Sequence, residues 1–200
     1  MKNGKKNEIS NKVWIIIISI CLVLIIFVAI GFAVFSNRED KVIERVENGG
    51  NIVLNYANNL SGLKLIDTAP TTDAIGMTDL TPGEYFDFSI DVNLDNATSV
   101  EYEISIVKDS KNSTIDDDDI RIYLEKENSG TFSSVFSPSS FVAITSSSEL
   151  GSPKGSMILY HETKKKSTAE NYRLRVWLSD SSVLTSGNYS VEVLVNGVAK

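Results

Sequence analysis

The sequence predicts a mainly β fold, in which an N-terminal transmembrane helix precedes an antiparallel β-sandwich of about 7–9 strands. Two observations support this prediction. An uncharged apolar run lies near the N-terminus, and a two-residue alternation of apolar and polar side chains recurs along the rest of the chain. The 200 residues leave room for one domain of ordinary size after the helix.

The composition excludes several classes of function. The chain has one cysteine, Cys21, and one histidine, His161, which is too few for a disulfide-stapled module or a Cys/His zinc site. Its formal net charge of −7 argues against a basic nucleic-acid binder, so we expect no nucleic-acid partner.

The apolar run occupies residues 13–35 and contains no charged side chain. A helix of this length covers roughly 34 Å, slightly more than a bilayer hydrocarbon core of about 30 Å. Trp14 stands at its start, as an interfacial aromatic does. A cleaved signal peptide has a shorter apolar region and a small-residue cleavage site, so the sequence predicts an uncleaved anchor.

The flanking charges predict the orientation of this helix. Residues 1–12 form a basic tail with four lysines against Glu8, and the positive-inside rule places such a tail in the cytoplasm. The chain from about Ser36 onward carries twenty-five of the twenty-six acidic residues. We therefore expect a single-pass protein of the cell membrane with an acidic extracellular domain.

Residues 36–50 are predicted to form a juxtamembrane stalk. The segment from Asn37 to Glu47 can continue the helix, with an apolar stripe that either packs against the domain or pairs two helices. Gly49 and Gly50 would end it. The β-sandwich domain then occupies residues 51–200.

Strands are predicted where apolar residues alternate with polar ones. The clearest are Phe86 to Leu94, Val100 to Ile106, Ile120 to Leu124, Tyr172 to Leu178 and Tyr189 to Val195; weaker ones are Ile52 to Tyr56, Leu63 to Ile66, Phe141 to Thr145 and Met157 to His161. Turn-rich breaks separate them, including Asn128-Ser129-Gly130 and Ser137-Pro138-Ser139-Ser140. Because no crossover helix is predicted, the sandwich should be antiparallel and Ig-like.

Four consecutive carboxylates, Asp116, Asp117, Asp118 and Asp119, precede one predicted strand. Ca²⁺ prefers six to eight oxygen ligands and would relieve the repulsion among them, which makes this run a candidate calcium site. Their spacing differs from the EF-hand pattern, so a solvated acidic loop is the alternative interpretation.

Arg173, Arg175 and Trp177 alternate with the apolar residues of another predicted strand and form a candidate binding surface. Guanidinium groups beside an indole bind anionic or sugar ligands. In the alternative interpretation, the arginines pair with Glu192, Glu101 or Glu103, and a loop covers Trp177.

No catalytic residue is predicted. His161-Glu162 begins like a metalloprotease motif, but the chain has no second histidine, and no nucleophile signature accompanies His161. We therefore expect a protein that is not an enzyme and needs no cofactor, calcium excepted.

The segments Tyr172 to Leu178 and Gly187 to Val193 carry a resemblance to known proteins. With the basic tail and the apolar run, the chain resembles single-pass, N-terminally anchored surface proteins of low-GC Gram-positive bacteria with one Ig-like β-sandwich. In layout it is also similar to camelysin-like biofilm-fibre proteins. The resemblance implies a surface location and supplies no catalytic residues.

Three functions are compatible with this architecture. The first is a non-catalytic adhesion or envelope-interaction module that binds a protein or cell-envelope partner. The second is a structural subunit of a surface fibre or lattice that assembles by strand addition. The third is an accessory subunit of a membrane complex.

Overall fold

The structure is a computed structural model and describes residues 41–43, 51–56, 62–78, 84–184 and 186–200. The predicted basic tail 1–12, the predicted transmembrane helix 13–35 and most of the stalk 36–50 lie outside the described residues. Within the described ranges, no helix is both long and apolar enough to cross a membrane. The β-rich unit spans Glu39–Lys200.

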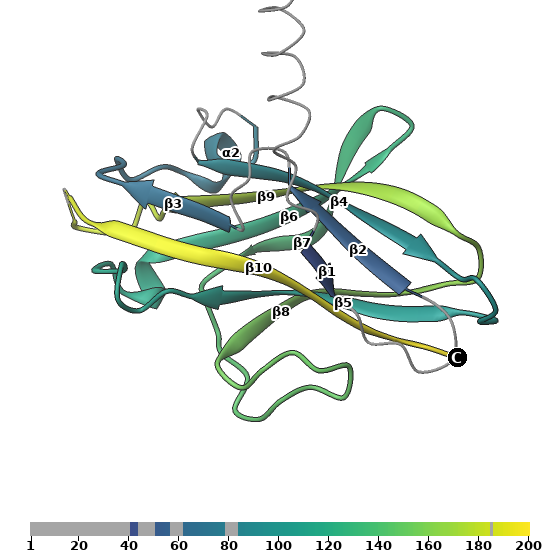
Figure 1. The fold of residues 1–200 in the computed structure, drawn as a ribbon. Helices are drawn as coiled ribbons and strands as arrows, with labels where there is room; N and C mark the ends of the chain where they lie inside the picture. Colours follow the sequence, from purple (N-terminus) through teal and green to yellow (C-terminus); the bar gives the residue numbers. More distant parts are fainter. Residues whose placement is uncertain (1–40, 44–50, 57–61, 79–83, 185) are drawn as a thin grey trace, which may run out of the picture. The chain divides into compact units, whose positions relative to one another are not determined.

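Two antiparallel sheets make up this unit (Figure 1). The six-stranded sheet has the order β1 (Lys41–Ile43), β2 (Asn51–Tyr56), β4 (Tyr85–Asn93), β9 (Thr168–Leu178), β6 (Ile120–Asn128) and β7 (Thr131–Ser139). The four-stranded sheet has the order β3 (Gly62–Ile66), β10 (Asn188–Ala199), β5 (Val100–Lys108) and β8 (Ser156–Lys164). The prediction of a mainly β, antiparallel fold is confirmed.

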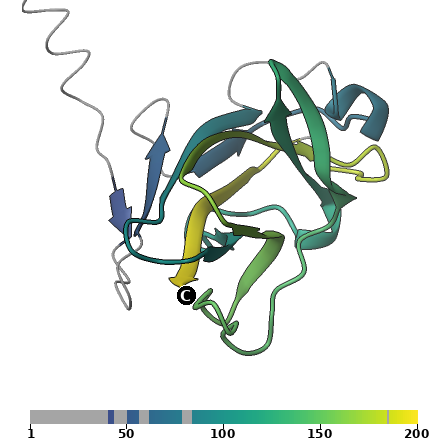
Figure 2. The same ribbon diagram turned by 90° about the vertical axis from the view of Figure 1, so that its right-hand side faces the viewer.

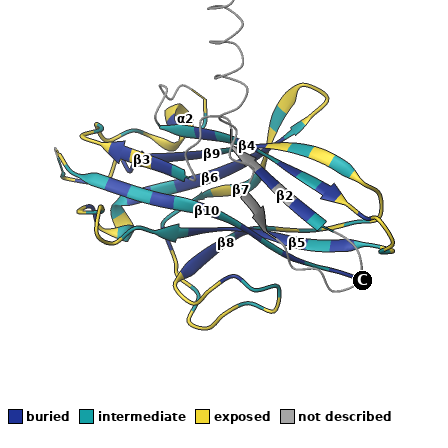
Figure 3. Ribbon diagram, in the orientation of Figure 1, coloured by how far each residue is buried: buried dark blue, intermediate teal, exposed yellow. Residues whose placement is uncertain are grey.

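The core lies between the two sheets. In β4 and β10 every second residue is buried, and the buried positions include the apolar residues of the predicted alternation (Figure 3). The strands therefore present one apolar face to the opposite sheet and one polar face to solvent. Tyr102, Tyr172 and Tyr189 are fully buried within this core.

One strand differs from the prediction. The structure forms β7 at Thr131–Ser139, across the predicted break at Ser137 to Ser140, while Phe141 to Thr145 is a loop. Pro138 is tolerated because β7 is an edge strand, where a missing N–H need not break a ladder. Phe141 is buried although it lies outside a strand.

Three residues of the predicted stalk are extended rather than helical. Lys41–Ile43 forms β1 rather than a helical turn and pairs with Ile52, Val53 and Leu54 of β2. Val42 and Ile43 are β-branched, and such side chains favour extended backbone when a neighbouring strand offers hydrogen bonds.

The connection from β7 to β8 carries the chain from one sheet to the other (Figure 2). The described residues also form a one-turn helix, α2 (Asp73–Gly76), between β3 and β4, and a 3-10 turn, η1 (Asp117–Asp119), before β6. These short elements lie beside the candidate functional residues.

Candidate functional site

The four carboxylates of the acidic run do not converge. Asp117 accepts hydrogen bonds from Lys108 Nζ at 2.6 Å and from the Tyr189 hydroxyl at 2.9 Å, and Asp119 donates its backbone N–H to the carbonyl of Asp116. Among the residues that the structure describes, no group of three or more His, Cys, Asp or Glu side chains is placed to hold a metal ion. The structure thus brings no calcium site together at the acidic run, and Asp117 instead fixes the start of β6.

Arg173 is held in a fixed position on the outer face of the six-stranded sheet. Its Nε and Nη2 donate to the two carboxylate oxygens of Asp87, at 2.6 and 2.8 Å. Its guanidinium carbon lies 4.6 Å from the centre of the Tyr85 ring and 4.5 Å from that of Phe132. The hydrogen bonds that Arg173 donates to Asp87 raise the pKa of Arg173 against the opposing effect of burial, so the guanidinium stays charged.

Arg175 and Trp177 are buried, which corrects the expectation that all three residues form an exposed surface. Arg175 Nε donates to Glu125 Oε2 at 2.7 Å, and only 7% of Arg175 is exposed. Trp177 is fully buried against Gly76 of α2, where an added Cβ would lie 2.3 Å from the indole. A short helix, rather than an irregular loop, therefore covers the indole.

The arginine partners also differ from the expected ones. Glu101, Glu103 and Glu192 belong to the four-stranded sheet, whereas both arginines lie on β9 of the other sheet. The register places Asp87 of β4 and Glu125 of β6 opposite Arg173, on its two sides. Strand order, which the sequence does not reveal, decides these pairs.

We call the outward-facing side chains of β4, β9, β6 and β7 the polar platform. It consists of Tyr85, Asp87, Glu125, Glu127, Phe132, Asn171, Arg173 and Arg175. Asn171 Nδ2 donates to Glu127 Oε2 at 2.6 Å. Because each charged group is held by a neighbour, the donors and acceptors of this surface keep fixed positions.

A second polar group, which the sequence analysis missed, lies between the sheets. We call it the ion cluster, and it consists of Lys126, Glu162, Lys164 and Glu170 with the hydroxyl groups of Tyr102 and Tyr172. Lys126 Nζ lies 2.7 Å from Glu162 and 2.9 Å from Glu170, and Lys164 contacts the same two carboxylates.

The tyrosines complete the ion cluster from the core side. The Tyr102 hydroxyl lies 2.9 Å from Glu162, 2.8 Å from Glu170 and 2.7 Å from the Tyr172 hydroxyl. Burial, followed by the neighbouring Tyr172 and Glu170, raises the pKa of Tyr102, so this phenol remains a hydrogen-bond donor. Since Tyr102 and Glu162 come from one sheet and Lys126 and Glu170 from the other, the ion cluster links the two sheets.

The cluster also has a clear charge state. Burial raises the pKa of Glu162, but hydrogen bonds from Lys126, Lys164 and Tyr102 outweigh it and lower that pKa to about 2. The pKa of Lys126 is raised by its two glutamate partners despite burial. Both glutamates are therefore ionised beside a charged Lys126, and the arrangement serves as a cross-link between sheets.

A sequence signal for the ion cluster existed. Lys126 continues the inward row of Ile122 and Leu124, and Glu170 continues the inward row of Tyr172 and Leu174. A charge at an inward position predicts a buried partner. The partner itself depends on which strands face each other, and the alternation alone does not reveal that.

A buried carboxylate on the outer face of the four-stranded sheet holds the loop between β7 and β8. Glu103 accepts a hydrogen bond from the backbone N–H of Ser152 at 3.0 Å and another from Ser148 Oγ. Ser152 Oγ in turn donates to Ser105 Oγ at 2.8 Å. These contacts fix part of the loop against the sheet.

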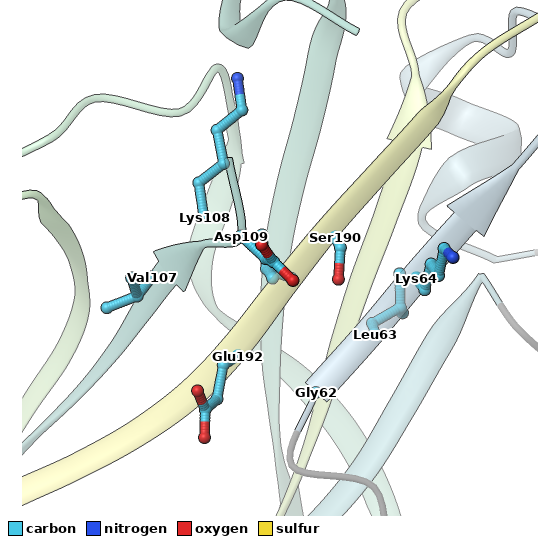
Figure 4. A pocket seen from close by; sticks show the side chains of 9 residues that line it. Gly62, Leu63, Lys64, Val107, Lys108, Asp109, Ser190 and Glu192 are labelled. Atoms are coloured by element: carbon cyan, nitrogen blue, oxygen red, sulfur yellow. The ribbon is translucent and has the colours of Figure 1, made fainter. Parts of the chain in front are cut away.

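A pocket of about 470 Å³ lies across β3, β10 and the end of β5 (Figure 4). Ser190 and Glu192 project from β10, Lys64 lies on β3, and Asp109 follows β5. The Lys108 ammonium is engaged elsewhere, by Asp117 and by the Tyr189 ring at 4.9 Å. The residues that line the pocket carry both positive and negative charges. The lining therefore does not indicate a single class of ligand.

Neither a protein-family model, nor a curated protein, nor a solved structure matches this chain. Function is therefore inferred from the geometry of these surfaces and from the sequence pattern.

Proposed function

We propose that this chain is a single-pass cell-membrane protein with a cytoplasmic N-terminus, whose extracellular Ig-like β-sandwich is a non-catalytic envelope-interaction module. The membrane part of the proposal rests on the apolar run 13–35 and its flanking charges. The interaction part rests on the polar platform.

The observation that carries the interaction proposal is the preorganised arginine of the polar platform. Arg173 donates two hydrogen bonds to Asp87 and packs against the rings of Tyr85 and Phe132. Its side chain therefore loses little conformational freedom when a ligand binds. Asn171 beside it is exposed. A surface of this kind recognises partners through hydrogen bonds of fixed direction.

The charge of the polar platform indicates the class of ligand. Arg173 is paired with Asp87, and the buried Arg175 is paired with the buried Glu125, so the carboxylate of Glu127 leaves an excess of negative charge. An anionic ligand would be repelled, whereas the hydroxyl groups of a neutral glycan donate to carboxylates and accept from amides. We therefore favour a neutral, hydroxyl-rich envelope polysaccharide over an anionic polymer.

Co-sedimentation with purified, insoluble cell-wall polysaccharide tests this proposal. The Asn171→Ala and Arg173→Gln variants should lose most of the bound fraction, while Thr163→Ala on the four-stranded sheet should keep it. Binding that all three variants retain would rule out the polar platform as the contact surface.

The alternative of a surface fibre built by strand addition requires two complementary free edges on each subunit. β1 has three residues and includes Lys41, β3 has five and includes an exposed Lys64, and β8 carries His161 and Lys164. Short length or edge charges oppose strand addition at these three edges, so β7 is the one uncharged edge among the described strands. These edges favour the interaction module over a continuous fibre. The accessory-subunit alternative depends on residues 13–35, which lie outside the described residues.

A further inference from the structure

β7 differs from the other edge strands in that it carries no charge. Residues 129–148, which include all of β7, contain no Asp, Glu, Lys or Arg, although 22% of the chain is charged. Within the described part of the chain, β7 pairs only with β6. Among the described residues its other edge has no strand partner, although β7 also contacts β8 of the opposite sheet. An unpaired, uncharged edge is a template for another strand.

The turn before β7 shows which backbone groups face outward. Ser129 and Gly130 have φ of 51° and 83°, and Asn128 pairs with Thr131 across this two-residue turn. The pair that closes such a turn is hydrogen-bonded, and hydrogen-bonded pairs alternate with non-bonded ones. The N–H and C=O groups of Phe132 and Ser134 therefore point away from β6.

Only the first half of β7 is suited to pairing. The register between β6 and β7 shifts on both sides of Leu124, and Pro138 lacks an N–H donor. Such irregularities protect the second half of the edge. In the first half, Thr131, Ser133 and Ser134 are exposed.

We propose that the segment Thr131–Ser134 pairs with the same segment of a second copy of this chain. The two strands run antiparallel about a two-fold axis at Ser133, so that Phe132 of each copy faces Ser134 of the other. The outward N–H and C=O groups of Phe132 in each copy then form hydrogen bonds with those of Ser134 in the other copy. This gives about four hydrogen bonds between the copies.

The charge distribution indicates where a second copy can approach this chain. Two copies with a formal net charge of −7 each repel one another, and an edge without charge is where that repulsion is smallest. The pairing is self-complementary, so it closes at two copies and leaves no free edge of the same kind. The product is therefore a closed dimer. This dimer proposal does not depend on the polysaccharide proposal.

Disulfide trapping of the full chain in detergent tests the register. In a Cys21→Ser background, Ser133→Cys should form a dimer under mild oxidation, because facing residues of a non-bonded pair lie about 4.5 Å apart at Cα, within disulfide range. Ser146→Cys, in the exposed loop after β7, is the matched control and should stay monomeric. Equal cross-linking of both variants, or of neither, would overturn the proposal.

Analytical ultracentrifugation of the full chain over a concentration series tests the dimer itself. The unmodified chain should associate to two copies and no further. Ser134→Lys places like charges on both sides of the two-fold axis and should raise the dimer Kd at least about tenfold. Ser146→Lys adds the same charge away from the edge and should leave the Kd unchanged. A monomer at every concentration, or a dimer that tolerates Ser134→Lys, would contradict pairing at β7.

Discussion

At the scale of single residues, Tyr102 joins the hydrophobic core to the ion cluster. Its ring is fully buried, and its hydroxyl contacts two carboxylates and a second phenol. Each glutamate of the ion cluster has a pKa below its ordinary value, because the lysines favour the charged form more strongly than burial opposes it. Stability therefore depends on these carboxylates staying ionised.

This dependence predicts the response of the domain to acid. The pKa of Glu162 falls from 4.5 to about 2 on folding, so its stabilising contribution is complete above about pH 5 and is lost as the pH falls towards 2. Glu162→Gln should lower the free energy of unfolding by about 1–3 kcal/mol at pH 7. The difference from the unmodified chain should shrink at pH 3.

Urea denaturation at pH 7, 5 and 3 measures this difference. Glu149→Gln, at an exposed loop position, is the control and should behave as the unmodified chain at each pH. A Glu162→Gln effect that is the same at all three pH values would show that the ion cluster does not control acid sensitivity.

Gly76 leads to a second prediction at this scale. A Cβ at this position would lie 2.3 Å from the buried Trp177 ring, so Gly76→Ala must displace α2 or the indole. Overpacking of this kind costs about 1–3 kcal/mol. In residues 39–200, where Trp177 is the only tryptophan, the fluorescence maximum should shift to longer wavelength. Ala74→Ser, at an exposed position of α2, should change neither quantity; an unshifted Gly76→Ala spectrum would mean that α2 does not cover the indole.

At the scale of elements, the β6–β7 hairpin depends on its turn. Gly130 has φ of +83°, in the region that favours glycine, and no atom lies within 4 Å of the place a Cβ would occupy. A substitution here therefore changes backbone strain and no packing contact.

Gly130→Ala should lower the free energy of unfolding by about 1 kcal/mol, measured by urea denaturation. Ser129 also has positive φ, and asparagine tolerates that conformation well, so Ser129→Asn should leave stability equal or slightly higher. A Gly130→Ala domain with unchanged stability would indicate a different turn geometry.

At the scale of the whole molecule, every core residue that the structure describes belongs to the β-rich unit. The core cluster runs from Ile52 to Ala199, and the chain divides between Arg38 and Glu39. Among the described residues, the buried apolar area that stabilises the fold thus belongs to the sandwich.

Residues 39–200 should therefore unfold cooperatively, with a urea midpoint within experimental error of that of the same unit in the full chain held in detergent. Circular dichroism measures both transitions. A fragment without a cooperative transition would show that residues 1–38 contribute to folding.

The alternation of apolar and polar residues by itself determined the fold class and most strands, because an inward row must be apolar wherever two sheets bury a common core. It predicted β4, β5, β6, β9 and β10 clearly, and β2, β3 and β8 more weakly. It missed β7, since Pro138 and the serine-rich pattern carry no alternation, and an edge strand needs little burial.

Only the tertiary structure decided which side chains meet. Arg173 and Arg175 were recognised in the sequence, but Asp87 and Glu125 became their partners through strand order and register. Likewise, the ion cluster exists because β8 and β9 belong to opposing sheets. A local pattern indicates whether a residue faces inward. Its contacts depend on strands far away in the sequence, and no local pattern encodes which strands become neighbours or in which register they pair.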